Sequence, residues 1–101
     1  MPEPAVGREA GRPLVTVVIA ARDAAGALGP TIETALAQTH RPLEVVVVDD
    51  GSTDATAEVA RAFGAPVRVV EQPPTGTAAA CNTGLAAARG SVVALLGVGD
   101  R

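Results

Sequence analysis

Aromatic side chains are almost absent from this sequence: of 101 residues, one is Phe and none is Trp or Tyr. Proteins that bind single-stranded nucleic acids usually stack the bases on aromatic rings. The net charge of −3, with scattered basic residues, also lacks the positive surface that nucleic-acid binding requires. We therefore expect no nucleic-acid partner, and a core built from Val, Leu, Ile and Ala.

Cysteine and long apolar runs are scarce as well. Cys81 is the only cysteine, so no disulfide forms within the chain, and the reducing bacterial cytoplasm is the expected location. No apolar run approaches the ~20 residues of a membrane-spanning helix. Residues 1–12 mix charges with Pro and Gly, which is not a secretory signal. We interpret them as a flexible leader before one domain at residues 13–101.

Apolar residues make up 48% of the chain and gather in short runs. The runs that predict strands are 14–21, 43–49, 67–70 and 91–96. Short runs of this kind are typical of strands buried on both faces of a parallel sheet. Apolar residues at helical spacing lie between them, the last within 78–89. The order β-α-β-α-β-α-β predicts an α/β fold with a Rossmann-like parallel sheet.

Local signals predict where these elements begin and end. Pro30 lies within the first helical pattern, and we expect it in the first turn, where proline is tolerated. Thr53 or Asp54 is expected to cap the second helix. Gly64 is placed to end it in the left-handed conformation. Residues 97–101 are expected to form a loop after the fourth strand.

Asp49 and Asp50 follow four valines at the end of the second predicted strand. In open α/β sheets, ligands bind beyond the carboxyl ends of the strands, and segments 20–23, 49–52 and 97–100 end at that edge. Two adjacent acids cannot both face the core, so at least one is expected to point into the crevice. There it can accept hydrogen bonds from a nucleotide base or from ribose. The plainer interpretation is a solvated turn and a helix cap.

Two other nucleotide- or phosphate-binding classes do not fit this sequence. A dinucleotide-binding domain needs G-x-G-x-x-G after its first strand, and residues 20–26 read A-A-R-D-A-A-G. A response-regulator receiver carries its acidic pair after the first strand, whereas Asp49 and Asp50 follow the second. We therefore reject a nicotinamide or flavin cofactor.

The combined pattern resembles the family 2 glycosyltransferases of the GT-A fold. It comprises L-A-Q-T-H-R-P-L-E, V-V-V-V-D-D-G-S-T-D-A-T and G-T-A-A-A-C-N-T-G-L-A-A-A-R-G. The resemblance covers about residues 14–100 and implies a partial GT-A domain, the nucleotide-sugar-binding half. Such an enzyme in its complete form transfers a sugar from an NDP-sugar, here with a UDP-sugar favoured, to an unknown acceptor. The alternative is a non-catalytic nucleotide-binding module or an inactive truncated remnant.

The resemblance also implies a set of donor-binding residues. They are Ala20, Arg22, Asp23, Asp49, Asp50, Gly51, Ser52 and Asn82. Asp50 matches the acid that contacts the base, whereas Asp49 matches one that more often supports the turn. Asn82 is expected either to contact the ligand or to hold neighbouring loops as a buried amide. No residue is nominated as the catalytic base.

In the family the fourth strand ends in a D-A-D-D motif, which holds Mn²⁺ or Mg²⁺ against the donor's diphosphate. Residues 97–100 read G-V-G-D here, so Asp100 is the remaining metal candidate. A divalent Mg or Mn cofactor is expected from the family, but one carboxylate on a glycine-rich segment is a weak site for it. An anionic ligand therefore needs a metal or a helix N-terminus to offset the acidic chain.

Further strands continue the sheet in the complete family fold, so residues 91–96 are expected to form a sheet edge in this chain. An open apolar edge invites pairing with another chain, and we expect self-association through it. Arg68 and Arg89 are interpreted as ordinary surface charges.

Overall fold

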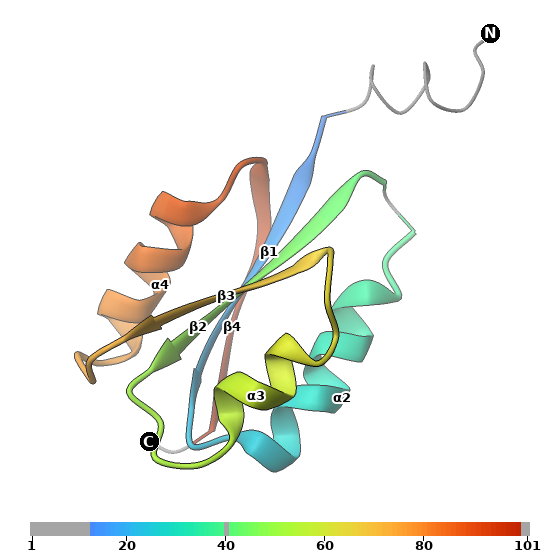
Figure 1. Ribbon diagram of the computed structural model, residues 1–101. Helices are drawn as coiled ribbons and strands as arrows, with labels where there is room; N and C mark the ends of the chain where they lie inside the picture. Colours follow the sequence, from blue (N-terminus) through green and yellow to red (C-terminus); the bar gives the residue numbers. More distant parts are fainter. Residues whose placement is uncertain (1–12, 40, 100–101) are drawn as a thin grey trace, which may run out of the picture.

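The computed structural model describes residues 13–39 and 41–99, and within them strands and helices alternate along the chain (Figure 1). The elements are β1 (Val15–Arg22), α2 (Ala25–Leu36), β2 (Leu43–Asp50), α3 (Thr56–Arg61), β3 (Val67–Gln72), α4 (Thr77–Ala87) and β4 (Ser91–Gly99). The predicted α/β class and element order are confirmed. The predictions for residues 1–12 and Asp100 fall outside the described residues.

The four strands form one sheet in the order β3-β2-β1-β4. Every pairing is parallel, which confirms the predicted Rossmann-like parallel sheet. The chain adds β2 and β3 on one side of β1 and then places β4 on the other side. The order thus reverses beside β1, and the carboxyl ends of β1 and β4 flank the place where such sheets bind ligands.

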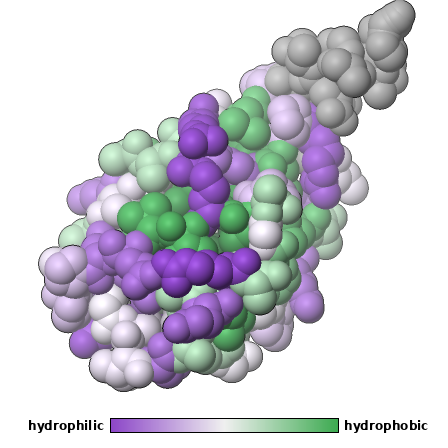
Figure 2. Space-filling model, viewed as in Figure 1, coloured by the Kyte–Doolittle hydropathy of each residue, from purple (hydrophilic) through white to green (hydrophobic). Residues whose placement is uncertain are grey.

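Helices cover both faces of the sheet: α2 and α3 lie on one face and α4 on the other (Figure 1). Because side chains alternate along a strand, Val45 and Val47 of β2 pack in the α2–α3 cluster. Val46 and Val48 pack in the α4 cluster, so β2 is buried on both faces. Apolar side chains are visible near the middle of the molecule in Figure 2, between polar surfaces.

Helix α4 lies very close to the sheet at Gly84. A Cβ atom at this position would lie 2.3 Å from Val18 Cγ1 and 3.3 Å from Val48 Cγ2. The missing side chain therefore lets the helix backbone approach β1 and β2. This close contact holds α4 against the sheet and so determines where the N-terminal end of the helix lies.

Strand β4 is longer than predicted. The expectation of a loop over residues 97–101 is wrong for Gly97–Gly99, which continue the strand. The reason is that β1 also continues to Arg22, and the two strands stay paired as far as Arg22 and Gly99. Val98 also packs against the α2–α3 cluster. Glycine indicated a break in the sequence, but the neighbouring strand supplies the hydrogen bonds that keep the segment extended.

Pro30 lies in the second turn of α2, so the prediction that it occupies the first turn is wrong. A proline normally crowds the preceding residue's Cβ in a helical conformation. Gly29 precedes it and has no Cβ, which removes this contact. Gly26, whose carbonyl loses its helical partner, is exposed.

The second helix begins later than predicted. Its N-cap residue is Ala55, without a side-chain cap, and not Thr53 or Asp54. Asp54 nevertheless accepts the backbone N–H of Thr56, the first helical residue, at 3.0 Å. Gly64 follows the helix with φ of 68°, which confirms the predicted left-handed ending.

Strand β4 is an edge of the sheet formed by the described residues, as predicted. Val93 is an extra residue in its pairing with β1, a β-bulge, and is 55% exposed. Leu95 and Leu96 are 48% and 38% exposed. Across residues 13–39 and 41–99, we find no helix with the length and apolar character needed to cross a membrane.

A buried carboxylate lies at the amino end of the sheet. Glu44 accepts the hydroxyl of Thr16 at 2.8 Å and the backbone N–H of Arg89 at 2.7 Å. Its other oxygen pairs with Arg68 at 3.1 Å. Burial alone would raise the pKa of Glu44, but these hydrogen bonds outweigh it and the pKa lies below its ordinary value. The interpretation of Arg68 as an ordinary surface charge is therefore wrong.

Candidate functional site

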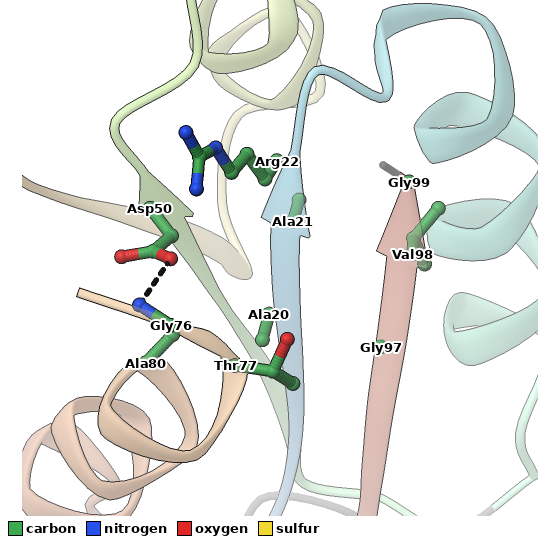
Figure 3. A pocket seen from close by; sticks show the side chains of 10 residues that line it. All are labelled: Ala20, Ala21, Arg22, Asp50, Gly76, Thr77, Ala80, Gly97, Val98 and Gly99. Carbon is green, nitrogen blue, oxygen red and sulfur yellow. Dashed lines mark hydrogen bonds between the residues drawn. The ribbon is translucent and has the colours of Figure 1, made fainter. Parts of the chain in front are cut away.

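A cavity of about 530 Å³ opens at the carboxyl ends of three strands. Residues from β1, β2, β4 and the first turn of α4 surround it (Figure 3). They are Ala20, Ala21, Arg22, Asp50, Gly76, Thr77, Ala80, Gly97, Val98 and Gly99. This is the edge of the sheet at which the strand order reverses. A pocket of a few hundred Å³ at such a point suits a small-molecule ligand.

Asp50 is the acidic side chain of the cavity. It lies on the α4 face of β2 and is buried, with 3% of its surface exposed. One carboxylate oxygen accepts the Gln72 side-chain amide at 3.0 Å and the backbone N–H of Thr75 at 2.9 Å. The other accepts the backbone N–H of Gly76 at 2.9 Å (Figure 3). Asp50 thereby holds the loop before α4 against the end of the sheet.

These contacts determine the charge state of Asp50. Burial on its own would raise the pKa of Asp50. Hydrogen bonds from Gln72, Thr75 and Gly76 outweigh the burial and bring the pKa below its ordinary value. The group is therefore an anion at neutral pH, with its negative charge shared among several donors. Of the two Asp50 carboxylate oxygens, the one bonded to Gly76 accepts fewer hydrogen bonds from the protein. It is therefore the oxygen with more capacity to accept a hydrogen bond from a ligand.

Asp49 points to the opposite face of β2. It is buried and accepts the backbone N–H of Ser52 at 3.1 Å. It therefore closes the turn that follows β2, and Asp50 alone of the pair lines the cavity. This is the division that strand alternation requires.

The loop after β1 and the turn after β2 are joined by a set of hydrogen bonds that we call the loop clasp, between residues 23–25 and 52–56. The Asp23 carboxylate accepts the backbone N–H of Thr53 at 2.7 Å. The backbone N–H of Asp23 donates to the Ser52 hydroxyl at 2.8 Å. The backbone N–H of Ala24 donates to the Thr56 hydroxyl at 2.9 Å. The clasp uses these polar groups to fix the two loops to each other.

Asp23 has φ of 48°, a left-handed conformation that Asp adopts more readily than most residues. Gly51 also has positive φ, at 75°, and a Cβ atom there would lie 2.4 Å from Pro74 Cδ. The turn after β2 therefore packs directly against the proline-containing loop before α4. Both residues shape the rim of the site through the backbone.

Arg22 is the cationic side chain of the cavity. It is the last residue of β1 and is exposed. Figure 3 shows the side chain extending from the end of β1 in the direction of Asp50. The two ion pairs among the described residues join Arg61 to Glu71 and Arg68 to Glu44. The Arg22 guanidinium is thus available to a ligand.

The first turn of α4 forms another wall. Gly76 is the N-cap residue and no side chain caps the helix. The N-terminal end of a helix carries a partial positive charge and free N–H groups. Gly76 and Thr77 place this end at the cavity, on the same side as the Asp50 carboxylate.

The end of β4 provides no carboxylate within the described residues. Gly97 and Gly99 line the cavity, and no three His, Cys, Asp or Glu of residues 13–39 and 41–99 are grouped to hold a metal ion. A Cβ atom at Gly99 would lie 2.1 Å from the Arg22 carbonyl oxygen. A carboxylate side chain therefore has no room at Gly99 in this arrangement. Within residues 13–39 and 41–99, the end of β4 therefore supplies no side-chain ligand for a divalent cation.

The donor-binding candidates from the sequence divide into three groups. Ala20, Arg22 and Asp50 line the cavity. Asp23, Asp49, Gly51 and Ser52 make the turn and the loop clasp. Asn82 is exposed on α4 and is not among the lining residues, so it is not a buried amide.

Sequence reasoning did not identify Thr77, Gln72 or Thr75 as part of the site. Thr77 begins a helix whose N-terminal end lies over the sheet edge, which the predicted order of elements could have indicated. Gln72 and Thr75 come next to Asp50 only when β2 and β3 pair in the folded chain. No motif in the sequence signals those contacts.

Comparison with known proteins places this arrangement in a family. The model of the family "Glycosyl transferase family 2" matches residues 16–98. An uncharacterised glycosyltransferase of Nostoc sp. is 40% identical over 90 residues, covering 85% of this chain and 28% of that protein. The succinoglycan biosynthesis protein ExoO of Rhizobium meliloti is 43% identical, covering 87% of this chain and 26% of that protein.

A solved structure has the same arrangement of elements. It is the mannosyltransferase PcManGT from Pyrobaculum calidifontis, in complex with GDP-Man and Mn²⁺. The TM-score is 0.70 at 34% sequence identity, covering 81% of this chain and 26% of that one. This chain thus spans about a quarter of the length of these relatives. With the family match across the whole sheet, the chain belongs to glycosyl transferase family 2.

Proposed function

We propose that the cavity binds the nucleotide part of a nucleotide-sugar, with Asp50 contacting the base. The observation that carries this proposal is the position of Asp50. Among the described residues, it is the one acidic side chain that lines the cavity at the reversal point of the parallel sheet. A fixed, ionised carboxylate at that point is an acceptor for the N–H groups of a uracil or guanine ring.

The complete form of the enzyme would use this site to transfer a sugar from an NDP-sugar to an acceptor. The matches to glycosyltransferases over residues 16–98 support this. A UDP-sugar is the donor that we propose from the sequence, and GDP is the natural comparison because PcManGT was solved with GDP-Man. A cytoplasmic location is part of the same proposal, because both nucleotides are cytoplasmic metabolites and the chain has one free cysteine.

The test is calorimetric titration of the chain with UDP and with GDP, each with Mn²⁺ and with EDTA. We expect binding of at least one nucleotide, and Asp50→Ala should weaken it by about tenfold or more, the effect of losing a buried charged hydrogen-bond partner. Glu33→Ala removes an exposed acid of α2 and serves as the control. Thermal melting of each variant separates lost binding from lost folding. Failure of both nucleotides under both conditions would refute the proposal.

A further inference from the structure

We propose that the Arg22 guanidinium, and not a divalent cation, holds the diphosphate of the nucleotide in this chain. The inference rests on the proposed function and states which group offsets the negative charge of the bound diphosphate. A nucleoside diphosphate brings at least two negative charges, and the cavity already contains the anionic Asp50. Something positive must therefore lie where the diphosphate binds.

The end of β4 is the first line of support. Gly97 and Gly99 occupy it, and neither supplies a metal ligand. Gly99 has φ of 114°, and a Cβ atom there would overlap the carbonyl oxygen of Arg22 and approach Ala24 Cβ to 2.8 Å. Asp100 is the one acid within residues 97–101. Mg²⁺ is usually held by one or two carboxylates together with waters and substrate phosphates, so residues 97–101 offer it at most one protein ligand.

The other carboxylates near the cavity are engaged with the protein. Asp50 accepts hydrogen bonds from Gln72, Thr75 and Gly76. Asp23 is occupied by Thr53 in the loop clasp, and Asp49 closes its own turn from the opposite face of β2. A metal bound to any of them would compete for carboxylates that hold the loops in place.

Arg22 is placed to meet the requirement instead. It lines the cavity at the end of β1, directly opposite Gly99 in the strand pairing. Figure 3 shows its side chain extending from the end of β1 toward Asp50, on the side of β1 away from β4. A guanidinium donates two parallel hydrogen bonds to phosphate oxygens and stays charged at all relevant pH values. Arg22 is the one cationic side chain that lines the cavity among the described residues, and it therefore supplies the positive charge that a diphosphate needs.

The loop clasp keeps the backbone that carries this side chain in position. Asp23 follows Arg22 directly, and both its backbone N–H and its carboxylate are tied to the turn after β2. The Arg22 backbone is also fixed by its pairing with Gly99. The backbone from which the guanidinium extends is thus fixed, which lowers the ordering cost of binding.

The experiment compares diphosphates with their nucleosides. The chain, freed of metal with EDTA, is titrated with UDP, GDP, uridine and guanosine by calorimetry, and the diphosphate titrations are repeated with Mn²⁺. For each diphosphate, we expect the affinity measured with EDTA to lie within about threefold of the affinity measured with Mn²⁺. Arg22→Ala should weaken diphosphate binding by about 10–100-fold and leave nucleoside binding unchanged, with Arg22→Lys in between. Arg61→Ala, which removes an exposed arginine outside the cavity, is the matched control.

A second variant adds the missing ligand. Gly97 has open space, because a Cβ atom there meets only Thr77 Cγ2 at 3.8 Å. Gly97→Asp should weaken diphosphate binding in EDTA and recover part of it with Mn²⁺. Diphosphate binding by the parent chain that requires Mn²⁺ would overturn this inference while leaving the nucleotide-binding function intact. Unchanged affinity of Arg22→Ala would overturn it as well. Absence of all binding would refute both proposals.

Discussion

Asp23 and Thr53 are joined by two hydrogen bonds although they lie far apart in the chain: the Asp23 carboxylate accepts the backbone N–H of Thr53 at 2.7 Å and its hydroxyl at 3.1 Å. The loop after β1 and the turn after β2 therefore move as one unit. Because Arg22 and Asp50 lie just before these two loops, their relative position depends on this pair.

Replacing Asp23 should destabilise the chain. Asp23→Ala removes the acceptor for Thr53 and places alanine at positive φ, so we expect a loss of about 1–2 kcal/mol in the free energy of unfolding. Asp23→Asn retains an acceptor and tolerates the backbone conformation, so it should lose less. Urea unfolding measures both, with Glu33→Ala as the control. Equal stability of Asp23→Ala and the parent chain would contradict the structural role of the clasp.

Stability should fall in acid because of Glu44 and Asp50. The pKa of each is lower in the folded chain than its ordinary value. A carboxyl group with a depressed pKa stabilises the fold above the unfolded-state pKa of about 4. That contribution is lost as pH falls through the folded-state value. Urea unfolding at pH 7 and at steps from pH 5 to pH 2.5 should show the decrease.

The corresponding variant is Glu44→Gln. It should be less stable than the parent chain at pH 7, because Arg68 and the backbone N–H of Arg89 lose a charged acceptor. Its stability should also change less between pH 5 and pH 2.5. A variant as sensitive to acid as the parent would show that Glu44 does not contribute to the pH dependence.

Alanine should be far more destabilising at Gly99 than at Gly97, the two glycines that line the cavity from β4. Gly99→Ala puts a Cβ atom 2.1 Å from the Arg22 carbonyl oxygen at positive φ, so we expect a cost of about 2 kcal/mol or more. Gly97→Ala makes ordinary van der Waals contact and should change stability by less than about 1 kcal/mol. Thermal and urea unfolding of the two variants form a matched comparison. A larger loss for Gly97→Ala would contradict the described end of β4.

The exposed edge at β4 should cause the isolated chain to self-associate. Val93, Leu95 and Leu96 are exposed there, and an unpaired apolar edge favours pairing with another strand. Sedimentation velocity over a concentration series should show species larger than the monomer. Leu95→Lys, which adds a charge to the edge, should shift the population toward monomer. A concentration-independent monomer of the parent chain would refute this expectation.

Much of the fold could be predicted because buried segments are recognisable in the sequence by their apolar residues. The valines of β2 are buried on both faces, and such strands appear in the sequence as unbroken apolar runs. The length of β4 could not be predicted in the same way. Gly97 and Gly99 carry no side chain, and their extended conformation comes from pairing with β1.

The candidate site was predictable in its position but not in its internal contacts. The acids at the end of β2 indicated the correct edge of the sheet, and strand alternation decides that Asp50 lines the cavity and Asp49 does not. The hydrogen bonds of Asp23 to the second loop join distant residues. Such pairings depend on the relative placement of two loops, which local sequence patterns do not encode. The same holds for the Arg68–Glu44 pair.

The contact of Gly84 with Val18 sets limits on how this protein can be re-engineered. Any substitution at Gly84 pushes α4 away from the sheet, and the helix carries one wall of the cavity with it. A library that varies α4 should hold this position constant and sample the exposed residues Ala78, Asn82 and Leu85 instead. Conversely, a smaller residue at Val18 offers a second route: paired with Gly84→Ala, it would keep the helix seated while changing the packing beneath it.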